Sequence, residues 1–212
     1  MKNMLRTNQL QYTYNKSDKT LVFPDLDCAA GETTLILGQS GVGKTTLLHL
    51  LAGILQTQAG NIVVNNQDLT KLKGSVLDKF RGQHIGIVFQ QAHFVQSITI
   101  FENLCLAQSV ANQPIDKTYI RELLSQMNIS ERANARPSEL SVGELQRASI
   151  ARAMVNKPTL ILADEPTSAL DDLNCEAVMD LLVQQANAQQ AALVIVTHDM
   201  RLKNRFLKKV IL

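Results

Sequence analysis

The stretch GQSGVGKT (residues 38–45) has the residue types and spacing of a loop that binds phosphate. It follows the apolar run TTLILG and precedes the helical pattern TLLHLLAG, which is the context that such a loop requires. Its glycines let backbone N–H groups turn towards phosphate oxygens, and the helix start adds a positive dipole end. A glycine-rich turn with an accidental lysine would not explain this context. We therefore expect nucleotide contacts from Gly38, Gln39, Ser40, Gly41, Val42, Gly43, Lys44, Thr45 and Thr46.

A second chemical feature is the carboxylate pair in LILADEP (residues 160–166). An apolar strand would deliver Asp164 and Glu165 to its carboxyl end, where ligands gather in parallel sheets. Asp164 can hold Mg²⁺ through its water, and Glu165 can polarise an attacking water. Lys44 would reach the β- and γ-phosphates, and the Thr45 hydroxyl would ligate the same Mg²⁺. Alone, such a pair would be a solvated strand end or a helix cap, but the phosphate loop favours the metal and base roles.

The segment LSVGELQR (residues 140–147) has two interpretations. Ser141 and Glu144 have the spacing of a helix N-cap and its answering N3 glutamate, so a helix to about Asn156 is predicted. The same helix start would present the Ser141 hydroxyl and the Gly143 N–H to a phosphate, and the two interpretations are compatible. A lone histidine at the position of His198, in VTHD after the last long apolar run, is more often a capping or surface residue than a catalytic one.

The elements that must position these residues are predicted from hydrophobic patterns. The runs TTLILG, IGIVF, TLILAD and AALVIVT are continuous apolar segments separated by helical stretches, which is typical of buried parallel strands in an α/β sheet. QLQYTY and NIVVNN indicate antiparallel strands near an edge. Residues 91–156 contain short helical patterns punctuated by prolines. We predict one domain, residues 1–212, with a nucleotide-binding core of residues 1–90 and 157–212 and an inserted helical lobe of residues 91–156.

Composition restricts the class of protein. The chain has 212 residues, 45% of them apolar, and a formal net charge of +2, which gives no reason to expect a nucleic-acid partner. No apolar run approaches the roughly 20 residues that cross a bilayer, and no secretory signal is visible, so a cytoplasmic location is expected. Three widely spaced cysteines without CxxC spacing are expected to be buried free thiols.

The series GQSGVGKT, VFQQ, LSVGELQR, LILADEP, SALD and VTHD, in this order, resembles the complete motif series of the ATP-binding cassette (ABC) family. The resemblance runs from Tyr14 to the final strand. It implies an α/β P-loop NTPase with a mostly parallel central sheet, an antiparallel β subdomain and an inserted helical lobe. It also implies a Mg²⁺-dependent ATPase with ATP and Mg²⁺ as cofactors.

The resemblance assigns roles to residues that spacing alone does not. It implies that Gln90 binds Mg²⁺ and couples the lobe to the core, that Glu165 is the general base, and that His198 senses the γ-phosphate. Tyr14 resembles the aromatic residue that stacks on adenine, although Tyr12 lies on the same strand face and stays an alternative; both tyrosines could also simply pack the strand.

The family resemblance further implies that two copies of the chain dimerise head to tail, so that the phosphate loop of one faces the LSVGELQR segment of the other across ATP. Ser141, Gly143, Glu144 and Asp171 would then contact the nucleotide or the interface from the second copy. Val142 and Glu144 depart from the glycine and glutamine usual in the family. A carboxylate there should oppose ATP unless it turns back onto the Ser141 N–H, so Glu144→Gln is expected to leave or improve dimerisation.

With one cassette and no spanning segment, the chain resembles the separate ATPase subunit of a membrane transporter, of the lipoprotein-release or macrolide-export type. An integral membrane permease would hold it at the inner face of the cell membrane. Residues 91–104 are the expected permease contact, with Phe94, Ile98 and Phe101 either in that contact or in the lobe core. The alternative is a soluble ABC ATPase acting on ribosomes or DNA. The basic run RLKNRFLKK favours a solvated helix face over a lipid contact.

Overall fold

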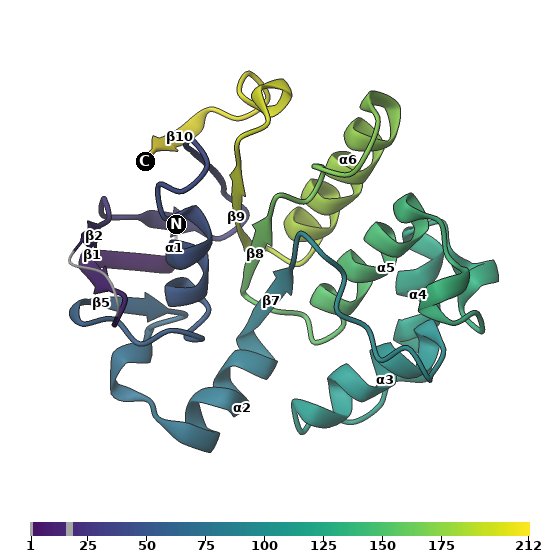
Figure 1. The fold of residues 1–212 in the computed structure, drawn as a ribbon. Coiled ribbons are helices and arrows are strands. Elements are labelled where there is room, and N and C mark those ends of the chain that lie inside the picture. The colour runs from purple at the N-terminus through teal and green to yellow at the C-terminus, as the bar shows by residue number, and fades with distance from the viewer. Residues whose placement is uncertain (1, 16–18) are drawn as a thin grey trace.

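The predicted apolar runs form the central sheet. The computed structural model describes residues 2–15 and 19–212, and in it five parallel strands lie in the order β10–β4–β9–β8–β7 (Figure 1). Because all its strands are parallel, their carboxyl ends meet at one edge, where a ligand site is expected. The strands are β4 (Thr33–Leu37), β7 (Ile85–Val88), β8 (Leu160–Asp164), β9 (Ala192–Thr197) and β10 (Lys208–Ile211).

A second sheet is antiparallel, as the patterns of QLQYTY and NIVVNN predict. Its strands lie in the order β2–β1–β5–β6, and β3 pairs with β1. Asn65 and Asn66 both have positive φ (46° and 66°), which suits the tight turn between β5 and β6. The strands are β1 (Asn3–Thr13), β2 (Thr20–Val22), β3 (Asp27–Ala29), β5 (Ala59–Val64) and β6 (Gln67–Asp68).

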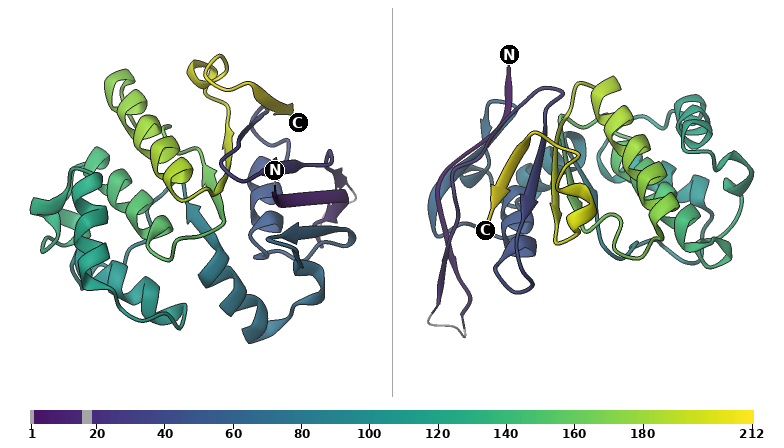
Figure 2. Two further views of the ribbon diagram at one scale, coloured as in Figure 1. Left: turned by 180° about the vertical axis from the view of Figure 1, so that it is seen from behind. Right: turned by 90° about the horizontal axis from the view of Figure 1, so that it is seen from above.

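The core has two parts, one on each face of the parallel sheet. Helix α1 (Lys44–Leu51) lies between the two sheets, and its leucines pack with both. The opposite face is covered by α5 (Val142–Met154) and α6 (Asp172–Ala188), which join the lobe helices in the larger cluster. Figure 2 shows the antiparallel sheet at one end of the molecule and the lobe at the other. The parallel sheet between them carries the phosphate loop.

Every regular element between β7 and β8 is helical, in agreement with the predicted lobe. Its three α-helices begin with side-chain caps, Thr99 before α3, Asp116 before α4 and Ser141 before α5, and the caps of α3 and α5 each form a capping box with a glutamate. Helix α5 ends at Met154, close to the expected end. The lobe elements are α3 (Ile100–Val110), α4 (Lys117–Gln126), η2 (Ser130–Arg132), η3 (Pro137–Glu139) and α5; before them lie η1 (Leu69–Lys71) and α2 (Gly74–His84).

The prediction of a helix for RLKNRFLKK (residues 201–209) is wrong. This segment contains the end of a short 3-10 turn, η4 (Met200–Leu202), and the start of β10. Lys208 and Lys209 pair with Thr34 and Leu35 of β4, and Val210 packs against the core. Edge pairing with a buried strand satisfies the backbone here, and this tertiary contact outweighs the local helical propensity of the Leu, Lys and Arg residues.

The cysteines are free, as expected, but only two are buried: Cys28 and Cys175 are buried, whereas Cys105 is half-buried. Burial raises the pKa of the Cys28 and Cys105 thiols, which disfavours the reactive thiolate form. Across residues 2–15 and 19–212, we find no helix that is both long and apolar enough to cross a membrane.

Candidate nucleotide-binding site

The phosphate loop joins the end of β4 to the start of α1. Gly41 and Gly43 have φ of 82° and 105°, the left-handed region that glycine adopts without strain. Gly43 is the N-cap of α1, so the free N–H groups of that helix face the loop. Lys44 is 8% exposed, and its ammonium donates to the carbonyls of Gly38 (2.8 Å) and Gln39 (3.0 Å). A buried cation and helix-start donors make this loop an anion site.

The metal-ligand candidates meet beside the loop. Asp164 ends β8 and accepts a hydrogen bond from Thr45, at the start of α1. Burial, and to a smaller extent the charge of Glu165, raise the pKa of Asp164. A buried carboxylate next to a hydroxyl is the oxygen donor set that Mg²⁺ prefers, and it gains from the charge of a cation. In the described part of the chain no group of three or more His, Cys, Asp or Glu is placed to hold a metal.

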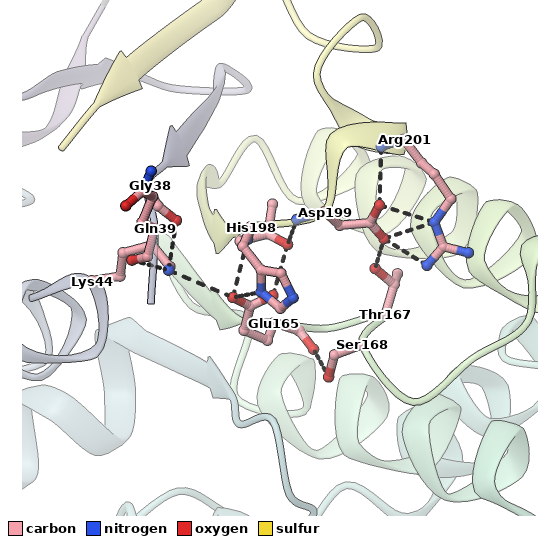
Figure 3. A network of polar contacts seen from close by, with 10 residues as sticks. Gly38, Gln39, Lys44, Glu165, Thr167, Ser168, His198, Asp199 and Arg201 are labelled. Carbon is pink, nitrogen blue, oxygen red and sulfur yellow. Dashed lines mark hydrogen bonds and ion pairs between the residues drawn. The ribbon is translucent and has the colours of Figure 1, made fainter. Parts of the chain in front are cut away.

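Glu165 is held in one orientation at the end of β8. Its φ is +46°, an unfavourable conformation for a side-chain-bearing residue, and its N–H donates to Val196 O of β9 (2.9 Å). Its carboxylate is 3.9 Å from the Lys44 ammonium and accepts from the His198 N–H (3.1 Å). Nδ1 of His198 lies 2.6 Å from the same oxygen, Oε1 (Figure 3). The predicted base and the predicted γ-phosphate sensor are therefore in direct contact.

Glu165 is also held by a hydrogen-bonded network that was not predicted from the sequence. The fully buried Thr197 hydroxyl donates to Glu165 Oε2 (2.8 Å) and accepts from the Asp199 N–H (2.9 Å). Asp199 in turn accepts from Thr167 (3.3 Å) and from the Arg201 guanidinium, which lowers its pKa (Figure 3). Thr197 and Asp199 lie within the VTHD motif, so the motif itself was the available signal.

A pocket of about 800 Å³ opens above the loop. Tyr14 lines it and Tyr12 does not: Tyr12 packs against the core, and the two rings meet edge to face at 4.9 Å. The Tyr14 hydroxyl is 2.8 Å from Thr46 Oγ1. Two further lining residues, Lys19 and Leu21, were not predicted. Leu21 lies on β2, which pairs with β1, and Lys19 directly precedes β2. The predicted residues in the lining are Gln39, Ser40, Gly41, Gly43, Lys44, Thr45, Thr46, Gln90, Glu165 and His198.

The other predicted residues lie outside this pocket. Gly38 and Val42 belong to the loop but pack on each other: a Cβ at Gly38 would stand 2.8 Å from a Val42 methyl. Asp164 lies beneath the lining. The remaining four, Ser141, Gly143, Glu144 and Asp171, belong to the starts of α5 and α6.

Those two helix starts form one continuous surface. A Cβ at Gly143 would lie 3.6 Å from Asn174 Oδ1, and Asn174 Nδ2 donates to both carboxylate oxygens of Asp171 (3.1 and 2.9 Å). Asp171 also caps α6 by accepting from the Asn174 N–H. The structure therefore brings the predicted residues together as two separate groups on one chain.

A model of the ABC transporter family matches residues 24–168, more than half of the chain. The chain belongs to the ABC transporter family. Two relatives of this ABC protein are lipoprotein-releasing system ATP-binding proteins LolD. The one from Idiomarina loihiensis is 37% identical, over 94% of this chain and 90% of its own. The one from Colwellia psychrerythraea is 38% identical, over 99% and 83%.

The fold is also that of a solved ABC structure. The dimeric, post-hydrolysis structure of the ATP-binding cassette MJ0796, bound to ADP and Pi, superposes with a TM-score of 0.87 at 30% identity, over 99% of this chain and 94% of that one. The predicted family and the P-loop α/β fold are confirmed. The ABC protein is an ATP-hydrolysing, nucleotide-binding subunit of a membrane transporter.

Proposed function

We propose that this chain binds ATP with Mg²⁺ in the pocket above the phosphate loop and hydrolyses it with Glu165 as the general base. Lys44 and the N–H groups of the loop bind the phosphates, because the loop ends at a helix start with a buried cation. Thr45 and Asp164 would hold Mg²⁺ together with Gln90, and the bound ion supplies charge neutralisation to the phosphates. Tyr14 is the proposed adenine contact, since it lines the pocket where Tyr12 does not.

The base works through its fixed orientation. Glu165 Oε2 is held by Thr197 and Oε1 by His198, so the carboxylate has no rotational freedom to lose on the way to the reaction. A water placed between Glu165 and the γ-phosphate would give its proton to this carboxylate. The His198 side chain is 63% exposed, so its ring would turn from Glu165 towards a phosphate oxygen while the backbone N–H of His198 still holds Oε1.

The ATP site is completed by a second copy of the chain. This proposal is supported by one observation above all: the LSVGELQR segment starts a capped helix with donors for phosphate, yet it does not line the pocket of its own chain. Together with Asp171, it forms a separate half-site. The similar cassette MJ0796 is described as dimeric.

Glu165→Gln tests both the base and the dimer. The amide keeps the size of the side chain but cannot take a proton, so turnover should fall by roughly 10²–10⁴-fold while ATP still binds. Gel filtration with ATP should show a stable dimer of Glu165→Gln, and Lys44→Ala should fail to dimerise because it binds ATP weakly. Normal turnover by Glu165→Gln would remove Glu165 as the base, and a monomer at high protein concentration would refute the dimer.

We also propose that an integral membrane permease docks in a groove between α2, α3 and α5, at the inner face of the membrane. The groove has a volume of about 880 Å³. Its rim carries the exposed side chains of Val95, Leu106 and Val110, and Arg152 and His93 lie within it. The lining also carries polar and charged side chains from all three helices, among them Asp78, Asn103 and Arg152. An amphipathic partner helix would suit this mixed surface.

The groove includes only some of residues 91–104, the predicted permease contact. His93, Val95 and Asn103 from residues 91–104 line it, whereas Phe94 is buried in the lobe core and Phe101 packs against that core. For these two aromatic residues the core alternative is the better one. Ile98 is half-buried and is not in the lining.

The likeness to two LolD proteins supports a transporter of the lipoprotein-releasing type. Recovery of a polytopic membrane protein in a pull-down would support the transporter subunit, and a partner with a large extracytoplasmic domain would support this type. Co-sedimentation with ribosomes would favour the alternative, a soluble ABC ATPase.

A further inference from the structure

Glu144, the unusual carboxylate of the LSVGELQR segment, is held by a residue outside that segment. Its Oε1 accepts from Arg132 Nε at 2.8 Å, and its Oε2 accepts from the Ser141 N–H at 2.8 Å. In return, the Glu144 N–H donates to the Ser141 hydroxyl at 3.3 Å. Each carboxylate oxygen therefore has its own donor, and both hold the side chain back against the start of α5. These contacts, Arg132 first, lower the pKa of Glu144 to about 2.

Arg132 is itself well placed to act as a fixed donor. It ends η2, and the next residues of the chain are tied to the start of α3: Ala133 O accepts from the Phe101 N–H, and Ala135 O accepts from the Ile100 N–H, both at 2.9 Å. The arginine therefore reaches Glu144 from a backbone that is anchored to another helix of the lobe. Its side chain is 48% exposed and that of Glu144 is 20% exposed.

The arrangement bears directly on the half-site. A carboxylate at N3 of a helix is stabilised by the helix dipole, but it also adds a negative charge beside donors meant for a phosphate. Without Arg132, ATP would repel the Glu144 carboxylate, and this repulsion would turn the side chain away from the Ser141 N–H. Arg132 both neutralises this charge and fixes its direction.

We propose that Arg132 is a positioning residue for ATP-driven dimerisation: by holding the Glu144 carboxylate against the Ser141 N–H, it makes the LSVGELQR segment compatible with the γ-phosphate on a second copy. The inference rests on the proposed dimer. The same contact explains how the chain tolerates a glutamate where the family usually has glutamine. Arg132 neutralises the charge of the Glu144 carboxylate, whereas a glutamine amide has no charge to neutralise.

A double-mutant cycle tests the inference. All variants are made in the full-length Glu165→Gln chain, and the ATP-dependent monomer–dimer equilibrium is measured by analytical ultracentrifugation. Arg132→Met should weaken dimerisation by about fivefold, which is about 1 kcal/mol. Glu144→Gln should change it by less than about twofold, since it loses the charge and keeps a capping side chain. In the Glu144→Gln background, Arg132→Met should then have almost no effect.

The control is Arg121→Met. It removes the same charge from the lobe, but the Arg121 guanidinium lies over the Phe101 ring at 5.3 Å instead of on a carboxylate. Dimerisation of this variant should match that of the parent. Circular dichroism of each monomer checks that the lobe stays folded.

The outcomes separate the inference from the proposed function. An equal loss from Arg132→Met with and without Glu144→Gln would mean that Arg132 attracts the nucleotide directly, which overturns the inference. No loss in either background overturns it as well. A parent that stays monomeric with ATP refutes the proposed dimer and the inference with it.

Discussion

At the scale of single residues, the site depends on side chains that are fixed before any ligand arrives. Glu165 and Lys44 are both buried, 3.9 Å apart, and each is held by the backbone or side chains of its neighbours. Fixed donors and acceptors lose little freedom when a reaction begins, so such an arrangement favours catalysis. A test of the site should therefore disturb the orientation of the Glu165 carboxylate.

Thr197→Val tests this orientation. Valine has the same shape but no hydroxyl, so Glu165 Oε2 loses a donor and the Asp199 N–H loses an acceptor. We expect ATP turnover to fall by roughly ten- to a hundredfold and stability by about 1–3 kcal/mol. ATP affinity should change little, because Thr197 does not line the pocket.

Thr197→Ser is the matched control, since serine keeps the hydroxyl, and it should retain most of the turnover. Steady-state kinetics, equilibrium ATP binding and urea unfolding measure the three effects. If the serine and valine variants lose equal activity, the hydroxyl does not position the base.

At the scale of elements, α5 links the LSVGELQR segment to the parallel sheet. Its C-terminal half lies directly on β7: a Cβ at Gly86 would stand 2.3 Å from Ala153 O and 3.0 Å from Pro158 Cγ. These are a backbone atom and a ring, which cannot move aside as a flexible side chain can. Only glycine permits this close approach of helix and strand.

Gly86→Ala should therefore force α5 away from β7. We expect the free energy of unfolding to fall by about 3 kcal/mol, the upper part of the range for overpacking. Urea unfolding followed by circular dichroism measures it. A loss within about 0.5 kcal/mol, the usual effect of a surface substitution, would contradict the close packing of the two elements.

At the scale of the whole molecule, the nucleotide pocket and the proposed permease groove share the segment that follows β7. Gln90 lines the pocket, and Phe89 and His93 line the groove. Arg152 of α5 donates to His93 O and lies over the Phe94 ring at 4.5 Å. A partner seated in the groove would thus touch both the residue beside the ATP site and the helix of the LSVGELQR segment.

Leu106→Asp tests the groove. Leu106 is 40% exposed on its rim, and a carboxylate there should weaken an apolar docking contact at least about tenfold. Co-purification with the permease from membranes measures it. Leu207→Asp is the control, because Leu207 is fully exposed and does not line the groove. Equal recovery of the permease with both variants would argue against docking at this place.

Much of the fold and of the site follows from local sequence. The continuous apolar runs identify the buried parallel strands, because both faces of those strands are covered. The loop glycines and lysine, the carboxylates at the end of β8, and the capping box of Ser141 and Glu144 are set by residue types at short spacing. Each of these features depends on neighbours within a few residues along the chain, so patterns predict it.

Other features were decided by contacts between distant residues. Which tyrosine lines the pocket depends on how the chain runs at the end of β1, and the basic C-terminal run leads into a strand because β4 offered an unpaired edge. Arg132 reaches Glu144 across twelve positions, and Thr197 reaches Glu165 across thirty-two. Sequence determined which chemistry the chain carries, since that chemistry lies in short motifs; tertiary structure alone decided which residues hold those motifs in place, because packing and strand register bring them together.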